Sequence, residues 1–175
     1  LGIRVMNPMV NLVYITDQQN RLVSRRWHSM VGTRFDNGAY LNVWYNHHYE
    51  RLDEPFFVRD GVAIAPGGYH FGEFRLSFDS NPARRFYYKL NYSPRDFYDG
   101  TRTDKSLTLG ARLSNRLSAE GAYTRNDIDL AVANFDVDLA SLRIDYAMSP
   151  AMTLRTITQY NSSTDQWSTS ARFRY

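Results

Sequence analysis

Apolar and polar residues alternate with a period of two along most of this chain. Between residues 69 and 79, for example, Phe74, Leu76 and Phe78 alternate with charged or hydroxyl side chains. Successive side chains of a β-strand point to opposite faces of the sheet, so this pattern predicts strands with one apolar and one polar face. The alternation recurs in residues 85–92, 106–114, 141–146 and 167–175. Helical periodicity is scarce, and the sequence therefore predicts an all-β protein.

Strand length favours a membrane protein over a soluble one. Further strands are predicted at residues 10–16, 22–35, 39–51, 117–125 and 152–160, which makes about ten strands in all. Ordinary soluble strands average roughly 5–6 residues, whereas a tilted membrane strand needs about 9–11 residues. Most of the predicted strands match the longer class.

The predicted connections alternate in length. Short turns are expected at residues 36–38, 80–82, 114–116 and 149–150, and longer loops at residues 52–68, 93–105 and 126–137. The connections at residues 18–21 and 162–166 are short exceptions on the long-loop side. Asn37-Gly38 predicts a tight type I′ hairpin with two positive φ angles. Tight turns at one end and long loops at the other are typical of outer-membrane barrels.

The apolar face is predicted to contact lipid. It carries no formal charge in the five alternating segments, and a lipid-facing Arg near the bilayer midplane would cost about 2–4 kcal/mol. A soluble barrel or sandwich, which also has one apolar and one polar face, is the alternative. The residues predicted to face lipid are Phe74, Leu76, Phe78, Phe86, Tyr88, Leu90, Leu107, Leu109, Leu113, Leu142, Ile144 and Phe173.

Aromatic residues lie towards the ends of the predicted strands. Aromatic rings at both membrane interfaces form the girdles of a membrane barrel. The residues that suggest such girdles are Tyr14, Tyr40, Tyr69, Tyr92, Tyr146, Tyr160, Trp167 and Tyr175.

The polar face is predicted to line a hydrated lumen. Its mixture of arginines and carboxylates suits cross-strand ion pairs. It would favour anionic solutes in a pore, although balanced ladders that fill a closed lumen explain it equally well. The charged residues predicted to face the lumen are Arg26, Arg34, Glu73, Arg75, Asp79, Arg85, Lys89, Arg112, Glu120, Arg143, Asp145, Arg155, Arg172 and Arg174.

Composition narrows the class of protein further. The 175 residues are predicted to form a single domain, either a β-barrel or a segment of one. The absence of Cys excludes disulfides, Cys-ligated zinc and a thiol nucleophile, and no run of 18 apolar residues exists to form a membrane-spanning helix. The 21 basic and 18 acidic residues nearly cancel, so no nucleic-acid partner is predicted. The first residues lack the pattern of a signal peptide, which suits a mature protein or an internal fragment.

Candidate chemistry is sparse. Asp96 and Asp99 lie three residues apart in a predicted loop. They are weak catalytic candidates because paired carboxylates catalyse glycoside hydrolysis. The favoured interpretation is that both side chains cap turns. No metal site or cofactor is predicted, since the four histidines lack a ligand spacing. The carboxylates of Asp127, Asp129, Asp136 and Asp138 suggest calcium, but a solvated loop is favoured.

Three segments resemble a known family. They are residues 95–100 (RDFYDG), 159–162 (QYNS) and 171–175 (ARFRY), supported by residues 54–56 and 66–69. Together they resemble the C-terminal barrel of an uncharacterised bacterial outer-membrane family whose members carry an N-terminal module similar to family-nine carbohydrate-binding modules. The resemblance implies an outer-membrane location and a glycan-related role. The module is absent here and family members usually continue past the last of these segments, so the ten strands are either a whole barrel or part of a larger one.

The sequence thus predicts an antiparallel up-and-down transmembrane β-barrel of the bacterial outer membrane, porin-like in character. Its predicted role is that of a pore, an anchor or a component of envelope assembly. Its expected partners are the lipid bilayer and other envelope proteins or glycans. The alternative is an outer-membrane hydrolase with catalytic residues in the long loops.

Overall fold

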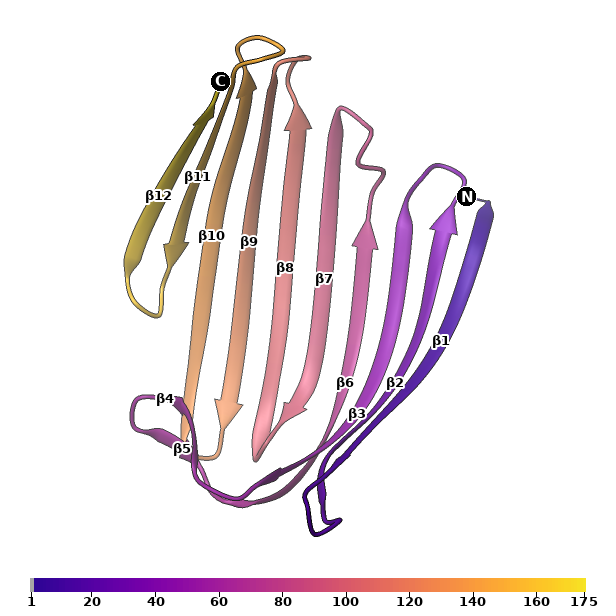
Figure 1. Cartoon of the computed structure of the whole chain (residues 1–175), viewed down its shortest axis with the longest axis vertical. Helices are drawn as coiled ribbons and strands as arrows, with labels where there is room; N and C mark the ends of the chain where they lie inside the picture. The colour runs from indigo at the N-terminus through magenta and orange to yellow at the C-terminus, as the bar shows by residue number, and fades with distance from the viewer. Residues whose placement is uncertain (1) are drawn as a thin grey trace.

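The computed structural model describes residues 2–175 and consists of one large antiparallel sheet with a small hairpin at one end (Figure 1). Each strand of the large sheet pairs with the next one along the chain, except that β3 pairs with β6. The ten strands are β1 (Ile3–Thr16), β2 (Leu22–Phe35), β3 (Tyr40–Leu52), β6 (Gly67–Asp79), β7 (Phe86–Phe97), β8 (Gly100–Arg112), β9 (Leu117–Leu130), β10 (Ala133–Ala147), β11 (Thr153–Asn161) and β12 (Gln166–Arg174). The all-β, antiparallel prediction and the number of strands are confirmed.

No helix in residues 2–175 is long and apolar enough to cross a membrane.

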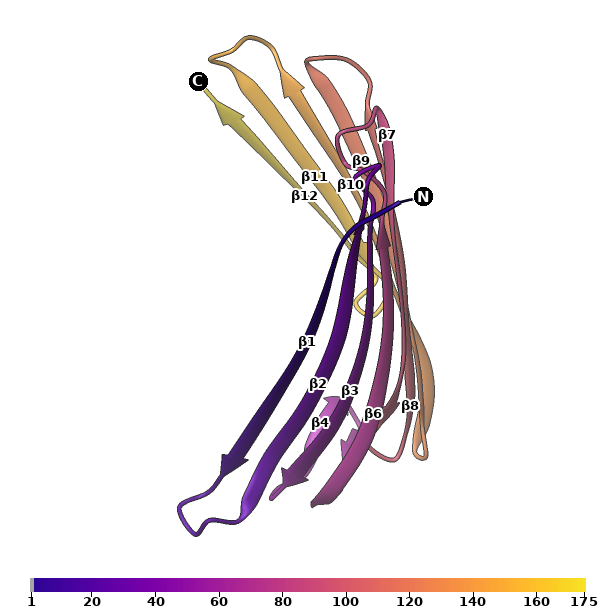
Figure 2. The ribbon, with the colours of Figure 1, turned by 90° about the vertical axis from the view of Figure 1, so that its right-hand side faces the viewer.

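The sheet is strongly curved but does not close on itself. In the described part of the chain, β1 pairs with β2 alone and β12 with β11 alone, so each leaves one edge unpaired. Seen from the side, the sheet bends into a trough (Figure 2). Both chain ends lie at the same end of the strands as the short turns β2–β3, β6–β7, β8–β9 and β10–β11 (Figure 1).

Two of the three predicted long loops are wrong. Strands β7 and β8 continue through residues 93–105 and meet at Tyr98 and Asp99, and β9 and β10 meet at residues 131–132. Charged residues occupy both faces of these extensions, which hides the alternation. They form cross-strand ion pairs that stabilise the ladder, such as Arg95 with Asp104 at 2.9 Å.

The third predicted loop contains a hairpin that packs against the end of the sheet. Strands β4 (Phe56–Arg59) and β5 (Val62–Ile64) form it, and it lies beside the far ends of β9 and β10 (Figure 1). Ile64 is 1% exposed and packs in an apolar cluster with Ile128 and Leu130. This cluster holds three of the four buried apolar residues among those described, so the long-loop end contains most of the compact core.

The β2–β3 turn differs in type from the prediction. Gly38 has a φ of 82°, but Asn37 is not among the residues with positive φ. The Asn37 side chain instead accepts a hydrogen bond from the backbone N–H of Ala39 at 2.9 Å. A type I′ turn needs two positive φ angles, so this connection is a longer turn with one left-handed glycine.

Candidate functional site: the two faces of the sheet

The strand register sorts the predicted residues onto two faces. We call the face that carries Glu73 the polar face and the face that carries Phe74 the apolar face. Cross-strand pairs run continuously from β1 to β12, so the face of every strand residue follows from the register. All the charged residues predicted for the lumen lie on the polar face except Arg85, and all the residues predicted for lipid lie on the apolar face except Leu113. These two residues lie just outside β7 and β8.

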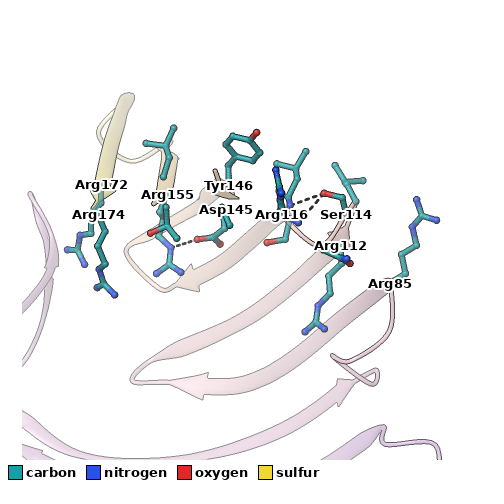
Figure 3. Close-up of a pocket in the computed structure, with 16 residues that line it drawn as sticks. Arg85, Arg112, Ser114, Arg116, Asp145, Tyr146, Arg155, Arg172 and Arg174 are labelled. Atoms are coloured by element: carbon teal, nitrogen blue, oxygen red, sulfur yellow. Dashed lines mark hydrogen bonds and ion pairs between the residues drawn. The ribbon is translucent and has the colours of Figure 1, made fainter. Parts of the chain in front are cut away.

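The polar face is the inner face of the trough. Close to the short turns, Arg112, Arg155 and Arg172 point towards the inside of the curve, whereas the Tyr146 ring points outwards (Figure 3). Curvature crowds inner side chains and spreads outer ones. Accordingly Glu73 is 5% exposed, while its apolar neighbour Phe74 is 40% exposed.

The apolar face carries an uncharged band with an aromatic border. On β7 the outward residues from Phe86 to Tyr92 are all apolar or aromatic and span ~20 Å, close to the roughly 25 Å apolar band of an outer-membrane barrel. A row of aromatic rings borders this band on the side of the long loop. Its members are Tyr14, Trp27, Tyr45, Phe74, Tyr92, Tyr123, Tyr160 and Trp167.

Two of the predicted girdle residues lie on the other face. Tyr40 pairs with Asp79 and Tyr69 pairs with Glu50, which places both rings on the polar face. Tyr69 contributes instead to the packing of the hairpin, because its hydroxyl donates to the backbone oxygen of Ala65 at 2.7 Å.

Beyond the aromatic row, the apolar face becomes charged. Lys105 and Arg125 donate to Asp127 at 2.8 and 2.7 Å, and Arg125 also lies 3.3 Å from Asp136. Three of the four carboxylates that suggested calcium, Asp127, Asp136 and Asp138, are therefore partnered by basic side chains. The change from aromatic to charged residues marks where the band ends.

A buried carboxylate organises the middle of the polar face. Glu73 accepts hydrogen bonds from Asn46 at 2.7 Å, Ser93 at 3.1 Å and Arg75 at 2.8 Å. Asn46 in turn contacts His28 Nδ1, and His48 Nε2 lies 3.6 Å from the Glu73 carboxylate. The network joins β2, β3, β6 and β7. It stabilises the Glu73 carboxylate, whose burial without partners would cost several kcal/mol.

The ion pairs continue across the next strands. Arg95 lies 3.7 Å from Glu73 and donates to Asp104 at 2.9 Å, and Arg102 donates to the same carboxylate at 2.7 Å. Arg95 and Arg102 lie directly opposite each other, but both pair with the Asp104 carboxylate, so the charges of this part of the face largely compensate one another.

A second network lies closer to the short turns. Tyr87 donates to Glu120 at 2.7 Å, and Arg143 bridges Glu120 at 3.1 Å and Asp145 at 3.3 Å. Asp145 also accepts from Arg155 on β11. The Tyr87 ring covers Gly110, where a Cβ atom would lie 2.0 Å from the ring.

The two weak catalytic candidates do not form a site. Asp96 lies within β7 on the apolar face, where it accepts a hydrogen bond from the backbone N–H of Gly72 at 3.0 Å. Asp99 follows Tyr98 in the turn between β7 and β8 and is exposed. In residues 2–175, no three His, Asp or Glu side chains gather as ligands for a metal ion.

Tyr98 fastens the hairpin to the sheet. It adopts a φ of 54°, which is strained for a bulky residue and is held by surrounding contacts. Its ring packs against Phe56 and Tyr69, and its hydroxyl donates to Glu50 at 3.2 Å. Burial, together with the neighbouring Glu50 carboxylate, raises the pKa of Tyr98 to about 12.

Sequence patterns could not find the partners of Glu73. His28, Asn46 and His48 lie far from it along the chain, and only the strand register brings them together. The sequence gives one partial indication. His47 and His48 are adjacent, so in a strand they must point to opposite faces, but which of them shares the face of Glu73 depends on the pairing of β3.

A comparison with solved structures finds an outer-membrane protein. The chain is similar to OmpT, an outer membrane protein of Vibrio cholerae, folded in vitro and in its trimer form, with 11% sequence identity and a TM-score of 0.57. The match covers 94% of this chain and 56% of that chain, so this chain spans little more than half of that protein's length. At this identity the likeness concerns the fold alone. The fold thus resembles that of an outer-membrane β-barrel, although the sheet is open.

No protein-family model and no curated protein sequence matches the chain. The resemblance to the barrel family with a carbohydrate-binding-like module therefore stays a prediction.

Proposed function

We propose that the chain forms part of the wall of a pore in the outer membrane of a bacterium. The apolar face contacts lipid, and the polar face lines a water-filled lumen. The observation that carries this proposal is the uncharged, aromatic-bordered band on the outer face of the curved sheet, backed by a charged inner face. The uncharged band can contact the hydrocarbon of the bilayer, and water can solvate the charged inner face.

A pore is favoured over a simple membrane anchor because an anchor has no need of so many inward charges. The hairpin β4–β5 packs over the long-loop end of the polar face, where it contacts Ile128 and Leu130. The hairpin therefore narrows the proposed lumen at the long-loop end. Short turns are the periplasmic ends of outer-membrane barrels, so the hairpin lies towards the outside of the cell.

The three tryptophans provide a direct test of which face meets lipid. Trp27 and Trp167 lie on the apolar face and are 46% and 70% exposed. Trp44 lies on the polar face, with the Arg75 guanidinium 5.8 Å from its ring centre. Single-tryptophan variants, with the other two changed to Phe, are reconstituted in vesicles that contain acyl-brominated lipid.

Brominated lipid is expected to quench Trp27 and Trp167 strongly, and Trp44 weakly. Aqueous iodide is expected to quench Trp44 more than the other two. The opposite pattern, or equal quenching of all three by iodide alone, would contradict the proposal. Stepwise conductance of the same protein in planar bilayers tests the pore itself, and membrane insertion without conductance would reduce its role to that of an anchor.

A further inference from the structure

The short-turn end of the polar face carries uncompensated positive charge. A hollow of about 1010 Å³ lies there between the ends of β8 and β12. Six arginines line it, and the four that lie on strands, Arg112, Arg155, Arg172 and Arg174, define what we call the arginine cluster. Their side chains point to the same side of the sheet (Figure 3). Arg116 lies in the turn between β8 and β9. Arg85 sits at the rim, points away from the others and stacks over the Phe86 ring at 5.6 Å.

The strand register sets these like charges beside one another. Arg155 of β11 lies directly opposite Arg172 of β12, and Arg174 follows two residues later on the same face. Like charges at directly opposed positions destabilise a sheet. Arg95 and Arg102 are also directly opposed deeper on the polar face, but there both guanidinium groups pair with the Asp104 carboxylate. Among the described residues, Arg172 has no such shared carboxylate.

Only one carboxylate lines the hollow, and it is already engaged. Asp145 bonds to Arg155 and also lies 3.3 Å from Arg143. Among residues 2–175, no carboxylate forms an ion pair with Arg112, Arg172 or Arg174. Three of the four guanidinium groups therefore have free donors that face the hollow.

The strand at the other open edge offers the cluster no carboxylate of its own. The free edge of β12 carries Arg172 and Arg174, and the other free edge belongs to β1. Residues 3–16, which form β1, contain no Asp or Glu. Pairing of the β12 edge with β1, within one chain or between two copies, would therefore bring no carboxylate of β1 itself to the arginines.

We propose that the arginine cluster binds a polyvalent oxyanion of the phosphate type, carried by a water-soluble solute. Planar guanidinium groups offer paired N–H donors that match two oxygens of a phosphate, and several of them together favour a doubly charged group. The inference rests on the proposed function in one respect, namely that the polar face is open to water. It adds the class of solute that such a pore would attract.

Calorimetric titration of the protein in uncharged detergent, with inorganic pyrophosphate as the probe, tests the site. Arg172→Gln and Arg112→Gln are each expected to weaken binding about tenfold, because each removes charge-assisted hydrogen bonds. Arg34→Gln is the matched control: Arg34 also lies on the polar face near the short turns, but on β2, away from the cluster. It is expected to leave binding unchanged.

Asp145→Asn separates electrostatics from damage to the fold. Removal of the only carboxylate in the hollow frees Arg155 and is expected to tighten pyrophosphate binding several-fold, an effect that misfolding would not produce. Equal binding by the wild type, Arg172→Gln and Arg112→Gln, or no binding by any of them, would overturn the inference.

A second arm distinguishes a soluble solute from a lipid headgroup. The same titration is repeated in micelles doped with an anionic phospholipid. Pyrophosphate binding that persists there supports a soluble ligand, whereas binding of the lipid alone overturns it. These titrations need no membrane, so a failure here leaves the tryptophan-quenching result standing, and a reversed quenching pattern leaves any measured binding standing.

Discussion

Glu73 offers the sharpest test of the polar face, because it is a buried charge with several identified donors. The Glu73→Ala variant leaves the amide of Asn46 and the hydroxyl of Ser93 without their acceptor, and both residues are buried. Each unsatisfied buried donor costs about 1–3 kcal/mol. In addition, the positive charge of Arg95 loses one of its neighbouring carboxylates. Arg75 adds little because its side chain is 43% exposed. The expected loss in the free energy of unfolding is about 3–5 kcal/mol.

The measurement is urea unfolding of the protein in detergent micelles, followed by tryptophan fluorescence. For a denaturant slope of about 2 kcal/mol per molar, the Glu73→Ala midpoint should fall by about 2 M. Glu73→Gln keeps the shape and one acceptor oxygen, so its loss should be smaller. Asp79→Ala is the matched control, since Asp79 lies on the same face of the same strand and its side chain forms no ion pair or hydrogen bond with residues 2–175. The change in its free energy of unfolding should stay within about 0.5 kcal/mol.

A Glu73→Ala midpoint as high as that of Asp79→Ala would refute the reasoning. It would mean that water, rather than the neighbouring side chains, solvates this carboxylate in the native state.

Three further predictions concern other parts of the molecule. Gly110→Ala should displace the Tyr87 ring, break its hydrogen bond to Glu120 and lower the free energy of unfolding by about 1–3 kcal/mol. Gly121→Ala has room for its Cβ, whose nearest neighbour would lie at 3.9 Å, and should raise the free energy of unfolding by about 0.5–1 kcal/mol. Urea unfolding midpoints measure both changes. Ile64→Ala should weaken hairpin packing by about 2–5 kcal/mol, which limited proteolysis detects as faster cleavage within residues 53–66, and unchanged cleavage would contradict the role given to this cluster. Because the pKa of Tyr98 is raised in the folded state to about 12, stability from this residue is complete below pH ~10 and is lost as the pH rises towards 12, and Tyr98→Phe should lessen that alkaline loss in pH-dependent unfolding.

The strands and their faces could be predicted because alternation is a local property. Leu107, Leu109 and Ala111, for example, must share one face of a strand wherever that strand pairs. The extensions of β7 to β10 were missed because charged residues on both faces there obscure the period. Whether the apolar face contacts lipid stays a prediction.

The candidate site was predictable only in part, because its geometry depends on register. The sequence identifies Arg172 and Arg174 as polar-face residues, but not that Arg155 lies opposite Arg172. It likewise could not assign His28 and Asn46 to Glu73, since their contact follows from the pairing of three strands.

The two unpaired strands have a consequence for biogenesis. Along β1 and β12, the outward half of the backbone N–H and C=O groups has no ladder partner. In hydrocarbon each such group costs several kcal/mol, so a whole row of them costs more than the roughly 5–15 kcal/mol that separate most folded proteins from unfolding. In the proposed membrane location, insertion and pairing of these two edges would therefore have to occur together, and the yield of folded protein would depend on the strands that pair with them.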